Sequence, residues 1–175
     1  GRICPEKGAD LAVELALQTG LPLKIAGIVP GGQEEFFSAK IRPWIDGKRI
    51  EFVGEVGPEE RNCLMGGALA LLHLIRAPEP FGLVMAEAMA CGTPVIGFAL
   101  GSVPEVVEDG MTGFVVDSLQ EAAAQIKNLA HIRRQDCRSR VEKLFTLEQM
   151  VTGYEQAFLD LLPRPAQDGL QHLRG

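Results

Sequence analysis

Two carboxylates, Glu79 and Glu87, flank a short run of small and apolar residues, with seven residues between them. Pro80 is compatible with the entry of a helix but not with its interior, so we expect a helix to begin near Phe81 or Gly82. The free N–H groups of a first helical turn, next to a glycine, can hold an anion or a hydroxyl group. Glu79 stands beside these groups, and Glu87 is the only charge on the helix. The segment therefore predicts half of a polar binding site.

The same carboxylates also have a purely structural interpretation. Glu79 could favour the positive end of the helix dipole, and Glu87 could be paired with an arginine. Two features favour a ligand instead. The amides of Phe81, Gly82 and Leu83 form a cradle, and Leu83 and Glu87, four positions apart, share the helix face above it. A phosphate or sugar at the helix tip, with a ribose near Glu87, fits this spacing.

Several segments of the sequence resemble the motifs of a known family. The segment from Glu79 to Glu87 resembles the E-x7-E signature of the retaining glycosyltransferases of family four, which have the GT-B fold. The first eight residues, GRICPEKG, resemble the family's G-R-x-x-x-x-K-G loop. Further similarity lies, in the family's order and spacing, at residues 23–27, 52–56, 101–107 and 110–116. The resemblance runs from Gly1 to about Leu162.

The resemblance implies roles for the residues that match. Arg2 and Lys7 would grip the diphosphate and neutralise the charge on the departing nucleotide. Glu79 would accept hydrogen bonds from hydroxyls of the donor sugar. Glu87 would accept two hydroxyls of the ribose, and Val56 would touch the base through its backbone.

The amides of Phe81, Gly82 and Leu83 would assist Glu79 in binding the donor. Before Glu79 the family often has an aromatic residue and a proline, whereas this chain has His73-Leu74, which leaves the sugar specificity open. The other polar residues carry structural predictions. Ser102 is expected to cap a short helix, and the isolated histidines to lie on the surface or in the core; these are His73, His131 and His172.

The implied reaction is transfer of a sugar from a nucleotide-diphosphate sugar, of the UDP or GDP type, to an acceptor with retention of configuration. The leaving phosphate can assist the acceptor from the same face, so catalysis rests on positioning and charge stabilisation. The acceptor is expected to bind to an N-terminal domain missing from this chain, so the fragment alone is expected to be inactive. A non-catalytic nucleotide-sugar binding module and a sugar-nucleotide epimerase of the same architecture remain alternatives.

The composition of the chain limits the classes of partner that we expect it to bind. The net charge of −6 over 175 residues argues against binding nucleic acid or anionic membranes non-specifically, and no apolar run approaches a membrane span. Membrane association is thus expected only through regions outside this chain, if at all. The four scattered cysteines are expected to be reduced thiols in a cytoplasmic protein. Without a D-x-D or a cluster of metal ligands, we predict no essential metal and no cofactor.

The alternation of strand and helix patterns predicts an α/β fold, a Rossmann-like doubly wound parallel sheet with helices on both faces. Strands are expected at 23–29, 50–54, 68–72, 95–98 and 114–116, and helices at 10–18, 34–44, 58–65, from 81, at 104–108, 118–130, 135–144 and from a capping box at 146–149 to about 162. The chain starts in a loop that normally follows a strand, so the first strand is apparently missing before Gly1. We expect a donor-binding domain at 1–162 and a mobile tail at 163–175. No G-x-G-x-x-G after a strand and no P-loop occurs, which argues against a dinucleotide oxidoreductase and a P-loop enzyme.

Overall fold

The computed structural model describes residues 1–162, so the prediction for the tail at 163–175 lies outside the described residues. All of its strand pairs are parallel. The strands are β1 (Leu23–Ala26), β2 (Ile50–Gly54), β3 (Leu71–His73), β4 (Val95–Phe98) and β5 (Gly113–Val116).

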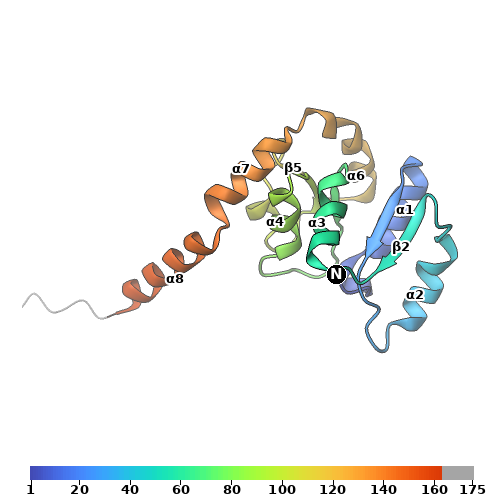
Figure 1. Ribbon diagram of the computed structural model, residues 1–175, viewed down its shortest axis with the longest axis horizontal. Helices are drawn as coiled ribbons and strands as arrows, with labels where there is room; N and C mark the ends of the chain where they lie inside the picture. The colour runs from blue at the N-terminus through green and yellow to red at the C-terminus, as the bar shows by residue number, and fades with distance from the viewer. Residues whose placement is uncertain (163–175) are drawn as a thin grey trace, which may run out of the picture.

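The helices alternate with these strands, as Figure 1 shows. The α-helices are α1 (Ala9–Thr19), α2 (Glu34–Lys40), α3 (Pro58–Gly67), α4 (Leu83–Ala90), α5 (Val103–Val106), α6 (Leu119–Gln125), α7 (Arg134–Leu144) and α8 (Leu147–Leu161). The 3-10 helices are η1 (Pro5–Lys7), η2 (Arg42–Trp44) and η3 (Ile126–His131). The predicted α/β class with parallel strands is confirmed.

The parallel strands form two sheets, one of order β1-β2 and one of order β3-β4-β5. Beside β1, the nitrogen of Gly1 donates to the carbonyl of Ala26 at 2.9 Å, and Arg2 forms an isolated parallel bridge with Ile28. The first residues therefore run alongside the end of β1. Their position brings the loop that contains Lys7 to the carboxyl ends of the strands, the edge at which ligands of parallel sheets bind.

Helix α1 joins the two halves because it buries side chains in both. Leu15 belongs to the core of the β3-β4-β5 sheet, whereas Val13 and Ala16 belong to the core around β1 and β2. A bidentate ion pair adds a polar link, since both terminal nitrogens of Arg76 donate to Asp10 at 2.8 Å. The loop that follows β3 is thereby held against the first turn of α1.

Some predicted boundaries are wrong for identifiable reasons. The strand expected at 68–72 begins only at Leu71, where pairing with Val95 starts; α3 continues to Gly67, and Leu69 is exposed. The helix expected at 34–44 breaks after Lys40 into a 3-10 turn that contains Pro43, which has no N–H to donate. The helix expected at 118–130 ends at Gln125 and continues as η3.

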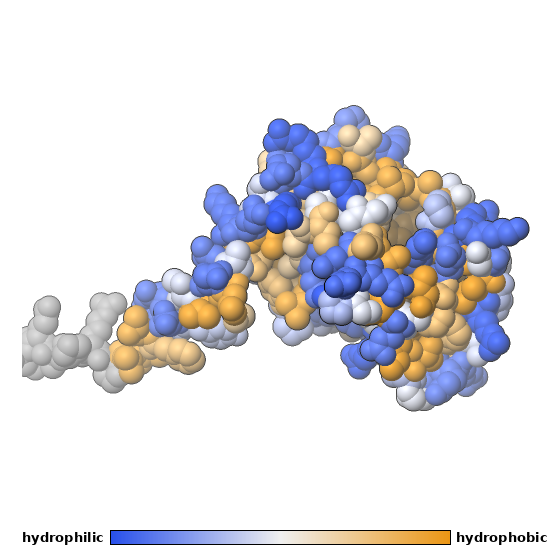
Figure 2. Space-filling model, in the orientation of Figure 1, coloured by the Kyte–Doolittle hydropathy of each residue, from blue (hydrophilic) through white to orange (hydrophobic). Residues whose placement is uncertain are grey.

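The last described helix, α8, leads away from the rest of the molecule (Figure 1). Its predicted capping box is confirmed, because the Thr146 hydroxyl accepts a hydrogen bond from the Gln149 amide at 3.2 Å. None of its residues is buried, and Figure 2 shows apolar surface along it. Among the helices of residues 1–162, none combines the length and apolarity that crossing a bilayer requires.

Candidate functional site

Helix α4 forms one side of the candidate site, and its N-terminus is set by Gly82. This residue occupies the N-cap with φ of 73°, a left-handed conformation that favours glycine, and the helix begins at Leu83. The amides of Phe81, Gly82 and Leu83 donate no hydrogen bond to any residue in the described range. These amides are therefore free among the described residues, and their role as a cradle for a ligand stays a prediction.

The body of α4 is buried, but its first residue is not. Met85, Ala86, Ala88 and Met89 pack into the core, whereas Leu83 is exposed. The helix packs against both α3 and α7. It is thus a fixed element that presents its N-terminus, and the face of Leu83, to the surface.

Lys7 and Glu79 meet at this helix tip as an ion pair. Lys7 ends the 3-10 turn η1, and Glu79 lies in the loop between β3 and α4. Both side chains are mostly covered, with 30% and 20% of their surfaces exposed. The turn is pressed closely onto the loop, because a Cβ on Gly8 would lie 1.9 Å from the Leu74 carbonyl oxygen. The structure therefore brings together Lys7, predicted to bind the diphosphate, and Glu79, predicted to bind the sugar.

Ser102 holds the loop before α4 in place. Its hydroxyl donates to the Phe81 carbonyl at 2.7 Å, and its amide donates to the Glu79 carbonyl at 3.1 Å. The prediction that Ser102 caps a short helix is confirmed for its position, the N-cap of α5, but its hydroxyl makes no capping hydrogen bond and donates to Phe81 instead. Gly101 makes the contact possible, since a Cβ there would lie 2.6 Å from the Glu79 backbone.

Glu87 has a cationic neighbour on α3. Its Oε1 lies 3.1 Å from Nη1 of Arg61, and 36% of its side chain is exposed. The arginine pairing considered as the structural alternative is thus present. The second carboxylate oxygen has no hydrogen-bond partner within residues 1–162, so a role toward a ribose stays a prediction.

Arg2 and Val56 contribute differently. The Arg2 side chain is exposed and forms no ion pair within the described residues. Val56 is half-buried in the loop between β2 and α3, so its contact with a base also stays a prediction. A shallow depression of about 350 Å³ lies over α2, but none of the predicted site residues lines it.

His73 lies in the core, one of the two environments expected for it, and borders the candidate site. It is the last residue of β3, is only 5% exposed, and its Nε2 is buried with no partner in the described part of the chain. Burial lowers its pKa; the nearby Glu79 carboxylate opposes this effect and the Lys7 ammonium adds to it. Its place at a strand end was visible in the sequence, but its burial was not. Of the other histidines, His131 is exposed, and His172 lies outside the described residues.

Metal ligands do not gather within residues 1–162: no group of three or more His, Cys, Asp or Glu side chains could hold an ion there. This finding does not test whether the protein needs a metal, so the expectation of no essential metal stays a prediction. The arrangement at the tip of α4 consists of free amides, a cation and carboxylates. Such a set can bind an anion and hydroxyl groups side by side.

The sequence matches the family "Glycosyl transferases group 1" over residues 1–143. The chain belongs to this family, and the resemblance seen in its motifs is confirmed.

Curated relatives agree with this assignment. The chain is 59% identical over 121 residues to a D-inositol 3-phosphate glycosyltransferase of Mycobacterium sp. strain KMS, covering 67% of this chain and 27% of that protein. It is 35% identical over 100 residues to the N-acetyl-alpha-D-glucosaminyl L-malate synthase of Bacillus anthracis, covering 53% of this chain and 26% of that protein. The chain thus spans about a quarter of the length of these relatives.

Solved structures confirm the fold. Sucrose-phosphate synthase from Thermosynechococcus elongatus superposes with a TM-score of 0.76 at 30% identity, over 91% of this chain and 44% of that one. Anabaena Alr3699/HepE, crystallised with UDP, superposes with a TM-score of 0.79 at 24% identity. The match covers 92% of this chain and 47% of that one. A third structure is the C-terminal domain of LpcC, a glycosyl transferase group 1 protein of Francisella tularensis. It superposes with a TM-score of 0.71 at 23% identity, and the match covers 84% of each chain. The described fold is therefore that of a C-terminal domain of this family.

Proposed function

We propose that this chain is the donor-binding domain of a retaining glycosyltransferase and binds a nucleotide-diphosphate sugar of the UDP or GDP type. The observation that carries the proposal is the convergence of Lys7, Glu79 and the free amides of residues 81–83 at the N-terminus of α4. These groups come from separate segments and match the chemical parts of such a donor.

Each part of the donor has a suitable group. Lys7, together with the exposed Arg2, supplies positive charge for the diphosphate in a chain that is otherwise acidic. Glu79 and the amides of the helix tip suit sugar hydroxyls, and the unpaired oxygen of Glu87 suits a ribose hydroxyl.

The relatives support the same ligand class. Alr3699/HepE has been crystallised with UDP and with UDP-glucose, and the relatives described above are named as a glycosyltransferase and as synthases. Transfer of the sugar would also need an acceptor site. We infer that the acceptor binds to a domain outside this chain, because the relatives are about four times as long as the part that this chain covers.

Calorimetric titration tests the proposal. UDP, GDP, ADP and their glucose or mannose conjugates are titrated into the wild-type chain, a Glu87→Gln variant and a Glu34→Gln control on the exposed α2. We expect one nucleotide to bind, Glu87→Gln to weaken it about tenfold, equivalent to about 1.4 kcal/mol, and Glu34→Gln to leave it unchanged. If no nucleotide binds to the folded chain, or if Glu87→Gln binds as the wild type does, the proposed site is wrong.

A further inference from the structure

His73 carries a buried polar atom that the described structure does not use. Its Nε2 is closed to solvent and has no hydrogen-bond partner within residues 1–162. Buried polar groups in folded proteins almost always have a partner, and leaving one unpaired is costly. An unpaired atom of this kind at the edge of a binding site suggests that its partner arrives in another state of the site.

Glu79 is the group best placed to be that partner. A Cβ built on Gly82 would lie 3.4 Å from His73 Nε2 and 3.5 Å from Glu79 Oε2. The imidazole nitrogen and the carboxylate oxygen therefore lie on either side of the Gly82 backbone position, where the Cε of Met85 also packs, 2.8 Å from that Cβ. No hydrogen bond joins them, and the other oxygen of the Glu79 carboxylate is paired with Lys7.

Binding of a donor would change this arrangement. A diphosphate carries more negative charge than one carboxylate and competes for the Lys7 ammonium. Once Lys7 turns to the diphosphate, Glu79 loses its cation, and a rotation of its side chain brings it to the imidazole. Because burial favours the uncharged form of His73, with Glu79 and Lys7 as the charged groups nearby, one ring nitrogen carries a proton that it can donate.

We propose that His73 is a positioning residue for the donor sugar: with a donor bound, its Nε2–H donates to the Glu79 carboxylate and holds it toward the sugar hydroxyls. The inference rests on the proposed function, since it needs a diphosphate to draw Lys7 away. It assigns to His73 the partner that its buried nitrogen lacks.

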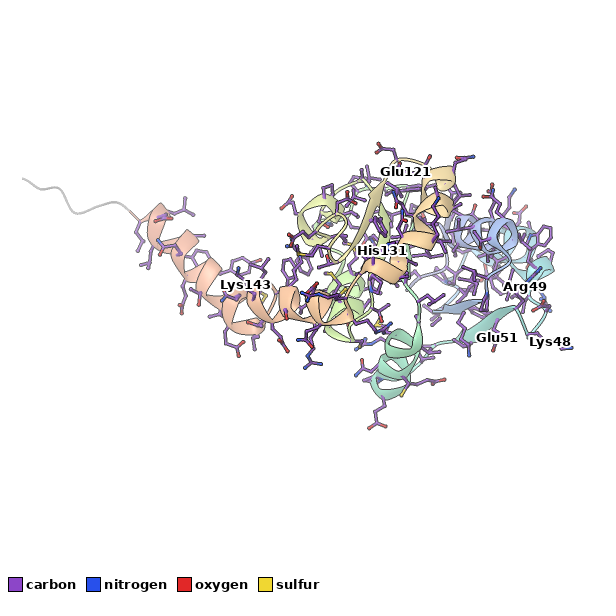
Figure 3. All side chains as sticks on the ribbon, turned by 90° about the horizontal axis from the view of Figure 1, so that it is seen from above. Lys48, Arg49, Glu51, Glu121, His131 and Lys143 are labelled. Carbon is purple, nitrogen blue, oxygen red and sulfur yellow. The ribbon has the colours of Figure 1, made fainter. Side chains whose placement is uncertain are left out.

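The test compares free nucleotide with nucleotide sugar. UDP and UDP-glucose, or GDP and GDP-mannose if the guanine pair binds more tightly, are titrated into the wild-type chain, His73→Phe, His73→Gln and a His131→Phe control on η3 (Figure 3). His73→Phe keeps a ring but removes the donor, so we expect it to weaken the nucleotide sugar about tenfold while free nucleotide binds as before. His73→Gln, whose amide can still donate, restores most of the affinity, and His131→Phe changes neither ligand.

A double-mutant cycle tests whether His73 acts through Glu79. In a Glu79→Gln background, His73→Phe is expected to have little further effect on the nucleotide sugar. A packing role would weaken both ligands equally or lower the melting temperature of the chain with no selectivity, and that result would overturn the inference. Equal affinity of the wild type for sugar-bearing and free nucleotide would do the same. If the wild type binds no nucleotide at all, the proposed function itself fails, and the inference fails with it.

Discussion

Lys7 and Glu79, which are 72 positions apart in the sequence, form an ion pair at the N-terminus of α4. The pair joins the residue predicted to bind a diphosphate to the residue predicted to bind a sugar. In the absence of a donor, each therefore satisfies the charge of the other. A nucleotide must compete with Glu79 for Lys7 before it can use this cation.

This competition predicts opposite effects of two substitutions on free UDP. Glu79→Gln removes the competing carboxylate, so UDP should bind about two- to fivefold more tightly, as expected for a partly exposed ion pair. Lys7→Met removes the cation and should weaken UDP about tenfold. Calorimetry measures both, with Glu34→Gln as the control. Weaker binding of UDP to Glu79→Gln would show that the ion pair does not restrain Lys7.

The close approach of η1 to the loop after β3 predicts a large stability effect at Gly8. Gly8 and Gly20 both have left-handed φ, of 69° and 72°, but only at Gly8 would a Cβ meet another atom, the Leu74 carbonyl oxygen at 1.9 Å. Gly20→Ala should therefore cost about 1 kcal/mol, and Gly8→Ala about 2 kcal/mol or more. Urea denaturation measures the free energy of unfolding of both variants. Equal losses would mean that the turn can move away from Leu74 freely.

Arg134 is predicted to anchor α7 to the segment between α3 and β4. Its guanidinium donates to the carbonyls of Ala68 and Gly66, at 2.9 and 2.6 Å, and to the Thr93 hydroxyl at 2.8 Å. Arg134→Met should lower the free energy of unfolding by about 2 kcal/mol, because it leaves these acceptors without a donor.

The neighbouring Arg133 provides the control. It is exposed and, within the part of the chain that the structure describes, pairs only with Asp136 in the first turn of α7, so Arg133→Met should cost less than about 0.5 kcal/mol. A similar loss from both variants would show that the contacts of Arg134 do not stabilise the chain.

Asp46 predicts an acid-dependent part of the stability. The backbone amides of Ile50, Lys48 and Arg49 donate to its carboxylate and lower its pKa from 3.8 to about 2. Because the folded pKa lies below the unfolded one, this stabilisation is complete well above pH 3.8 and is lost as the pH falls through 3.8 toward 2. Lys48 and Arg49, which follow Asp46 in the chain, lie at the end of the molecule away from α8 (Figure 3).

The measurement is the difference in urea midpoint between the wild type and Asp46→Asn as a function of pH. We expect the difference to be constant above about pH 5 and to shrink between about pH 4 and pH 2, since asparagine does not titrate. A difference that does not change with pH would show that the amides do not favour the charged form of Asp46.

The sequence predicted the order of elements well because several boundaries are marked by a local residue. Gly20 ends α1, Pro58 opens α3, and Thr146 caps α8. The boundary at residues 68–70 was predicted wrongly, because an apolar run alone cannot distinguish a strand from an exposed connection. The division of the strands into two sheets depends on pairing between distant segments.

The candidate site was predictable where a motif carried it. Glu79 and Glu87 were predicted from their spacing, and Arg2 and Lys7 from the resemblance of the first loop to the family; their roles toward a ligand stay predictions. The sequence did not point to His73 or Arg61. The burial of His73 and the ion pair of Arg61 with Glu87 arise only when β3, α3 and α4 pack together. The link between Lys7 and Glu79 likewise follows from the tertiary fold.

The measurement that tests the central claim most directly is an NMR titration of the ¹⁵N-labelled chain with UDP and GDP. The account predicts that the amide resonances of residues 1–8 and 81–87 shift together and saturate with one ligand per chain, because the nucleotide binds at the tip of α4. Shifts confined to other parts of the chain, such as the depression over α2, or no shifts from either nucleotide, would contradict it.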